Sequence, residues 1–163
     1  MSGILVVAEH TGGTFNATAS ELLGKATELG QALGKPVFAA VLGDAPAAEL
    51  GGFGATKVFQ ASGDFAPYNA GAQVDALEAI VAASGADVVL APASYASRDS
   101  LPRLTARLNG AMASDAHDLK VDGGKLVARR GIYAGRVEAD VVFDADFATA
   151  TVKPNSFSKP ESN

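Results

Sequence analysis

The run Ile4-Leu5-Val6-Val7-Ala8 is the stretch of this sequence that indicates the fold class. An uninterrupted apolar run of this length is typical of a parallel strand buried on both faces of a sheet. A second such run, Val88-Val89-Leu90, lies near the middle of the chain. Apolar stretches at residues 37–42 and 57–61 predict two further strands between them.

Helical patterns separate these four strands. Leucine and alanine recur at helical spacing from Leu22 to Leu33, and Gly34 predicts the end of this helix. Its start is predicted at a capping box formed by Thr18 and Glu21. Further helices are expected at residues 71–84, ending at Gly85, and from Asp99 or Ser100 onward, with Pro102 in the first turn; residues 46–50 predict a short one.

Alternating strands and helices predict an open α/β sheet with right-handed crossovers. The last third of the chain differs, because strand patterns at residues 119–121, 125–129, 137–143 and 148–153 follow one another without a helix. We therefore expect an antiparallel C-terminal extension of the sheet. Residues 1–153 are predicted to form this domain, and residues 154–163, with two prolines and three serines, to form a linker.

Composition excludes several classes of function. The 163 residues include no cysteine and only two histidines, so neither disulfides nor thiolate metal sites are expected. A formal net charge of -5 argues against a nucleic-acid partner. Because no apolar run approaches the roughly 20 residues of a membrane span, we expect no membrane insertion and a cytoplasmic location. A mitochondrial matrix location is the alternative, if a transit peptide has been removed.

Ligands of open α/β sheets bind beyond the carboxyl ends of the strands, so the loops there hold the candidate binding residues. They are His10, in the loop after the first strand, and Ser94 and Arg98, in the loop after Val88-Val89-Leu90. A small-residue turn before a helix favours an anion. No dinucleotide fingerprint, phosphate loop or nucleophile elbow accompanies these residues, so no catalytic site is expected. Asp140, Asp144 and Asp146 lack the spacing of a calcium site, so no metal site is expected either.

Five residues are candidates for contact with a partner protein. Two are arginines of the predicted third helix, where a solvated face is the alternative, and three are phenylalanines near the C-terminus, where a place in the core is the alternative. They are Arg103, Arg107, Phe143, Phe147 and Phe157.

Several short motifs together resemble the alpha subunits of electron-transfer flavoproteins. They are Ile4-Leu-Val-Val-Ala-Glu-His10, Leu90-Ala-Pro-Ala93, Leu101-Pro-Arg103 with Ala106-Arg-Leu108, Ser114-Asp115 and Arg130-Gly-Ile-Tyr-Ala-Gly135. Two positions depart from the family pattern: Gly131 stands where proline is usual, and Arg136 where asparagine or lysine is common.

The resemblance implies a three-layer, Rossmann-like domain similar to adenine-nucleotide hydrolases. It also implies that FAD is held by a further C-terminal domain beyond the linker, with no cofactor expected in this chain alone, and that a beta subunit completes a heterodimer. Acyl-CoA or other dehydrogenases would donate electrons, and a quinone oxidoreductase would accept them.

Two functions remain open at this point. The first is a scaffold and subunit-interface domain of the electron carrier, which is not an enzyme in itself. The second is a freestanding module that binds AMP or ATP with the loops at residues 9–13 and 92–99.

Overall fold

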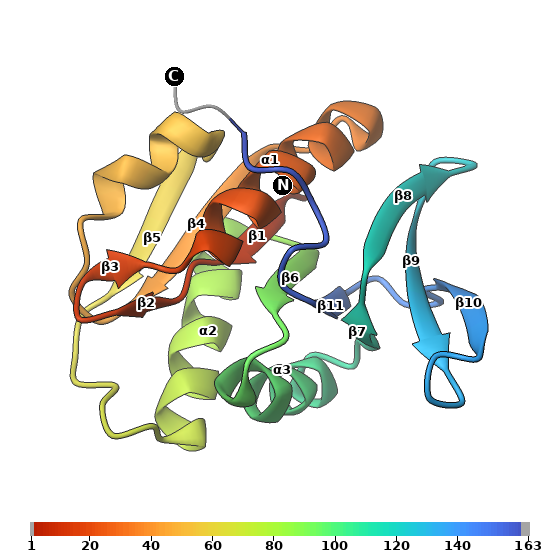
Figure 1. The fold of residues 1–163 in the computed structure, drawn as a ribbon. Helices are drawn as coiled ribbons and strands as arrows, with labels where there is room; N and C mark the ends of the chain where they lie inside the picture. Colours follow the sequence, from red (N-terminus) through yellow and green to blue (C-terminus); the bar gives the residue numbers. More distant parts are fainter. Residues whose placement is uncertain (1, 161–163) are drawn as a thin grey trace.

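The computed structural model of this chain describes residues 2–160 (Figure 1). Six strands form one central sheet in the order β5-β4-β1-β6-β11-β7, and every neighbouring pair is parallel. The strands are β1 (Ile4–Val7), β4 (Val37–Leu42), β5 (Lys57–Ala61), β6 (Val88–Pro92), β7 (Ala111–Ala116) and β11 (Ala148–Val152). The predicted strands of the first two-thirds and the α/β fold class are thus confirmed.

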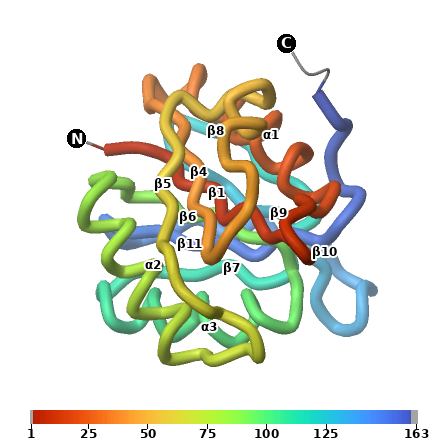
Figure 2. Tube along the Cα trace, turned by 90° about the vertical axis from the view of Figure 1, so that its left-hand side faces the viewer, coloured from red at the N-terminus to blue at the C-terminus, as the bar shows by residue number. Residues whose placement is uncertain are grey.

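Helices cover both faces of this sheet, which gives three layers. Alternate residues of β1 show the division, because Ile4 and Val6 pack with α1 (Ala17–Leu33). Leu5 and Val7 pack on the other face with α2 (Ala70–Ser84) and α3 (Tyr95–Arg107). Figure 2 shows α1 on one side of the sheet and α2 and α3 on the other. Burial on both faces explains why β1 and β6 are uniformly apolar.

Two predicted helix starts are wrong. The N-cap of α1 is Asn16, and no side chain caps it; Thr18 and Glu21 therefore lie inside the helix and form no capping box. The N-cap of α3 is Ser94, so the helix begins before Asp99 and holds Pro102 in its interior. The residues between Ser94 and Leu101 are mostly small or polar, which hid this first turn from a search for apolar periodicity.

The predicted antiparallel extension is only partly correct. A separate antiparallel sheet of three strands packs against α1. Its strands are β8 (Asp118–Asp122), β9 (Lys125–Ile132) and β10 (Val137–Val142). The last strand, β11, instead enters the central sheet in parallel between β6 and β7. Its two buried threonines are accommodated because Thr149 bonds Thr105 at 2.6 Å and Thr151 accepts the Asp115 N–H at 2.9 Å. Strand β7 was not predicted.

The remaining elements are small. A two-stranded hairpin of β2 (His10–Thr11) and β3 (Thr14–Phe15) follows β1, and the 3-10 helix η1 (Ala47–Phe53) stands where a short helix was predicted. Within residues 2–160, no helix is long and apolar enough to cross a membrane.

The predicted linker begins along the outer surface of α1. The Asn155 N–H donates to Glu21 at 3.0 Å, and the Lys25 ammonium lies 5.3 Å from the centre of the Phe157 ring. Residues 154–160 therefore pack on the domain, and residues 161–163 lie outside the described part of the chain.

Candidate functional site

The candidate site is a cavity of about 590 Å³ beyond the carboxyl ends of β1 and β4. At this edge the chain continues from β1 through β4 to β5 on one side of the sheet, and β6 lies on the other side of β1. Such a change of direction opens a crevice in which open α/β sheets bind their ligands. The cavity is lined by the loops after β1, β4 and β5 and by the first turns of α2 and α3.

Glu9 closes the part of this crevice that faces α3. Its carboxyl oxygen Oε1 accepts hydrogen bonds from the hydroxyls of Ser94 at 2.6 Å and Ser97 at 2.7 Å. Ser94 also accepts the Ser97 N–H at 3.0 Å as the helix cap. A side chain of the protein thus occupies the place at which a helix N-terminus would receive an anionic ligand. Ser94, one of the predicted binding residues, is therefore the N-cap of α3 and donates a hydrogen bond to Glu9.

His10, the second candidate, lines the same cavity. Its Nε2 lies 2.8 Å from the Leu42 carbonyl oxygen. Because a carbonyl oxygen only accepts, Nε2 carries the proton, and Nδ1 is buried without a partner among the described residues. The ring also meets Phe15 edge-on, with 6.0 Å between ring centres. His10 therefore ties the β2–β3 hairpin to the end of β4.

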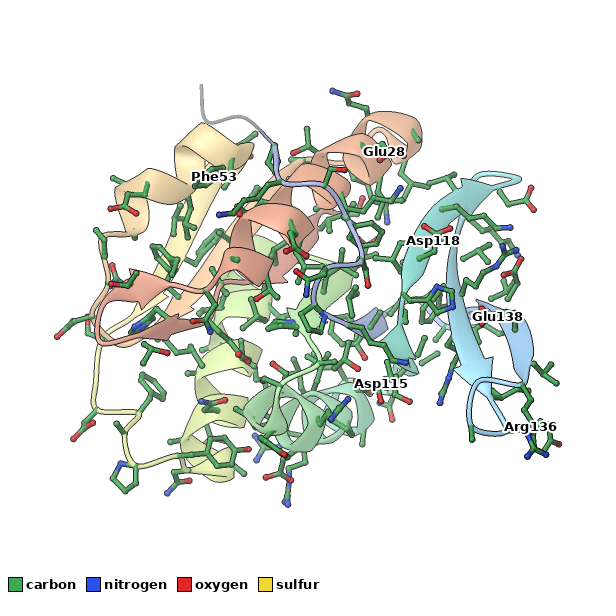
Figure 3. All side chains as sticks on the ribbon, viewed as in Figure 1. Glu28, Phe53, Asp115, Asp118, Arg136 and Glu138 are labelled. Carbon is green, nitrogen blue, oxygen red and sulfur yellow. The ribbon has the colours of Figure 1, made fainter. Side chains whose placement is uncertain are left out.

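Arg98, the third candidate, does not line this cavity. Its guanidinium makes a two-pronged contact with Asp115, through Nε at 3.0 Å and Nη2 at 3.1 Å. Asp115 belongs to β7 and has a left-handed backbone, with φ of 55° (Figure 3). The structure therefore brings His10 and Ser94 to one end of the sheet but directs Arg98 toward β7.

The charge around the cavity is negative. Glu9, Asp44 and Asp64 line it, whereas none of the described lining residues is a lysine or arginine. Phosphate groups need cations or free N–H donors, and here the α3 N-terminus already faces Glu9. The pyrophosphate of FAD, which the family resemblance implies for the whole protein, does not fit these residues.

Metal binding has no support in the described residues. No three histidine or acidic side chains between residues 2 and 160 lie close enough to hold a metal ion. Asp140 is engaged by Arg129 at 2.7 Å and by Lys120 at 2.8 Å. These contacts hold the pKa of the Asp140 carboxyl well below its usual range, as expected of cross-strand ion pairs.

The arginines predicted to contact a partner make ion pairs within the helical layer. Arg103 bonds Asp99 at 3.0 Å, and Arg107 bonds Asp75 at 2.6 Å and Glu78 at 2.9 Å. These side chains are exposed, and such pairs contribute little to stability. Their role in an interface stays a prediction.

The three predicted phenylalanines lie against the core. Phe147 is buried with α2 and α3, so it cannot form part of an exposed patch. Phe143 and Phe157 are partly buried against the α1 side. The large apolar side chains that are exposed lie elsewhere. Among them, Tyr133, Val137 and Val142 belong to the β9–β10 hairpin, and none of the three was among the predicted contact residues.

Tyr68 joins α3 to the loop before α2 through a bond of 2.8 Å from its hydroxyl to Asp99 Oδ2. Burial, with this hydrogen bond, raises the pKa of Tyr68 to about 12. The pKa of Tyr68 in the folded protein thus exceeds its unfolded value of about 10. We therefore expect the hydrogen bond of the protonated Tyr68 to stabilise the fold fully below pH about 10, and this stabilisation to be lost as the pH rises toward about 12.

The measurement is the tyrosinate absorbance of the wild type minus that of Tyr68→Phe. The difference should show a single late titration; a midpoint near pH 10 would contradict the bond to Asp99.

Comparison with known proteins agrees with the geometry above. The model of the electron transfer flavoprotein domain matches residues 4–163. An electron transfer flavoprotein subunit alpha of Syntrophomonas wolfei is 32% identical over 94% of this chain, which corresponds to 49% of that relative. One from Methylophilus methylotrophus is 32% identical over 96% of the chain and 50% of its own length.

A third relative bears a different name. The lactate dehydrogenase (NAD(+),ferredoxin) subunit LctC of Acetobacterium woodii is 28% identical over 98% of this chain and 40% of its own length. The chain thus spans about half the length, or less, of these curated relatives. Its nearly complete match to the family model nevertheless confirms the resemblance: this chain belongs to the electron transfer flavoprotein family.

Proposed function

We propose that this chain is the N-terminal domain of an electron-carrier alpha subunit and acts as a scaffold without an active site of its own. The observation that carries the proposal is the Glu9 carboxyl group at the N-terminus of α3, bonded to Ser94 and Ser97. It occupies the position where a nucleotide cofactor would place a phosphate on this fold. An electron carrier built on such a domain must hold its flavin elsewhere.

The scaffold has three tasks in this proposal. It binds a beta subunit, it orients the domain that holds FAD, and it leaves the flavin accessible to dehydrogenases and to a quinone oxidoreductase. The contacts of Asn155 and Phe157 with α1 support the second task, because they hold this segment against the domain. We place the protein in the bacterial cytoplasm, with the mitochondrial matrix as the alternative.

The test is to mix the purified chain with an electron transfer flavoprotein beta subunit from the same organism and to follow the mixture by size-exclusion chromatography. We expect co-elution, and we expect the chain alone to show no flavin absorbance. A flavin band that survives purification of this chain alone would contradict the scaffold function, and separate elution would contradict the subunit assignment.

The cavity of about 590 Å³ supports a second candidate, a small-molecule binding module. Its acidic lining disfavours AMP and ATP, since each phosphate would approach Glu9, Asp44 or Asp64 without a lining cation. We therefore expect calorimetric titration with AMP or ATP to release no heat and to leave the melting temperature unchanged. Saturable binding of either nucleotide would favour the module over the scaffold.

A further inference from the structure

The β9–β10 hairpin carries the apolar face of the three-stranded sheet beyond the core. Side chains on one face alternate along a strand, so Leu126 and Ala128, which are buried, share their face of β9 with Arg130 and Ile132. Ile132 pairs with Val137 at the end of the hairpin, and Val137 is 46% exposed. Toward the tip of the hairpin, α1 therefore no longer covers this face, and its apolar side chains become exposed.

Arg130 is an uncompensated cation on this face. Its Nη1 donates to the Ser114 hydroxyl at 2.8 Å, and its Nε is buried without a partner. Four other arginines differ from Arg130, because each forms an ion pair with a carboxylate. They are Arg98, Arg103, Arg107 and Arg129. Within residues 2–160, no carboxylate forms an ion pair with Arg130. A half-buried charge in this state is unfavourable unless another molecule supplies the counter-charge.

The turn beside Arg130 is strained. Three consecutive residues are left-handed: Tyr133 with φ of 51°, Ala134 with 56° and Gly135 with 81°. The left-handed region is uncommon for a bulky aromatic residue, and its use is associated with functional sites. The strained backbone presents the Tyr133 side chain to solvent at 76% exposure. Tyrosine combines a large contact area with a hydroxyl, which is why it is enriched at protein interfaces.

The charge of the hairpin tip is positive, although the whole chain carries -5. Arg136 extends from the tip, away from the rest of the domain (Figure 3). The nearby acids are already engaged: Glu138 contacts His117 at 2.5 Å, and Asp140 is held by Arg129 and Lys120. A partner that complements this tip must therefore be acidic.

We propose that the end of the β9–β10 hairpin is a protein-docking surface that receives a carboxylate of the beta subunit at Arg130. Tyr133 and Val137 form the apolar part of the contact, and Arg136 lies at its rim. The planar guanidinium suits a carboxylate, because its remaining N–H groups match the two acceptor oxygens. This inference rests on the proposed function, since it takes the beta subunit as the occupant.

The test is the affinity of the beta subunit for variants of this chain, measured by isothermal titration calorimetry. We expect Arg130→Gln to weaken binding about 30-fold or more, because the partner's carboxylate is left without its counter-charge. Arg130→Lys, which keeps the charge but not the planar fork, should fall between this variant and the wild type. Lys57→Gln removes a positive charge from β5, at the opposite edge of the central sheet, and should change the affinity less than twofold.

Thermal unfolding of the free chain separates docking from folding. If Arg130 serves the partner, Arg130→Gln should leave the melting temperature unchanged or raise it, because an uncompensated charge has been removed. A binding loss matched by a loss of thermal stability would overturn the proposal, as would full affinity of Arg130→Gln. A homodimer that Arg130→Gln dissolves would assign the surface to a second copy instead. Absence of any complex with the wild-type chain would contradict both the docking surface and the proposed function.

Discussion

Replacing Gly110 with alanine is expected to lower the free energy of unfolding by about 3 kcal/mol. A Cβ atom at this position would lie 2.6 Å from both the backbone oxygen and the Cδ1 atom of Phe147. Neither neighbour can yield easily, because that oxygen accepts the Ala111 N–H at 2.9 Å and the ring is buried. Gly110 is itself held by its N–H bond to Thr105. The added methyl group would therefore push β11 away from β7.

The measurement is chemical or thermal unfolding of the purified variant. The expected loss corresponds to a fall in melting temperature of about 6–12 °C for a chain of this size. Gly51→Ala is the matched control, since a Cβ there would meet nothing within 4 Å, and its stability should stay within about 0.5 kcal/mol of the wild type. A Gly110→Ala variant as stable as this control would show that β11 does not pack as described.

The second large effect is expected for Glu9→Ala, which should also destabilise the domain by about 3 kcal/mol. The substitution removes the acceptor of two hydroxyl groups, and one of these belongs to Ser97, which is buried. Hydrogen bonds to a charged group are each worth about 1.5–3 kcal/mol, and the two bonds share one oxygen, so their contributions are not simply additive.

Glu9→Gln keeps an oxygen of the same reach, so its loss should be roughly 1 kcal/mol. A double-mutant cycle with Ser94→Ala isolates the coupling between Glu9 and the α3 cap. Additive losses in this cycle would show that Glu9 does not hold the start of α3. They would also remove one of the two reasons for excluding phosphate from the crevice, namely that Glu9 occupies the N-terminus of α3; the acidic lining by Asp44 and Asp64 would remain.

Much of the fold is predictable because it depends on local patterns. Strands β1 and β6 are buried on both faces, so their continuous apolar runs identify them without reference to the rest of the chain. Gly34 and Gly85 end α1 and α2 with left-handed backbone, as glycine does at many helix ends. The turn at Gly123 and Gly124 is equally local.

The place of β11 is not predictable in this way. Its alternation of alanine and threonine suits either sheet, and only long-range bonds of Thr149 and Thr151 favour the centre of the parallel sheet. Strand β7 was missed for a related reason, because Ser114 and Asp115 interrupt its apolar pattern.

The candidate site shows the same division. His10 and Ser94 were found because they follow strands, and both lie at the carboxyl edge of the sheet. The role of Glu9 depends on serines far along the chain, and no local pattern signals it. Likewise, nothing in the sequence distinguishes Arg98, which pairs with Asp115, from Arg130, which has no carboxylate partner among the described residues. Which charges remain unpaired is decided by the assembled fold.

The central position of β11 constrains how this domain folds during synthesis on the ribosome. Strand β11 lies between β6 and β7 in the sheet. Neither strand can form its hydrogen bonds on that side until residues 148–152 have been synthesised. Nascent chains that stop short of Val152 would expose these edges, which are sites of misassembly. We expect the sheet to close late and cooperatively, with slow folding set by pairings between distant segments.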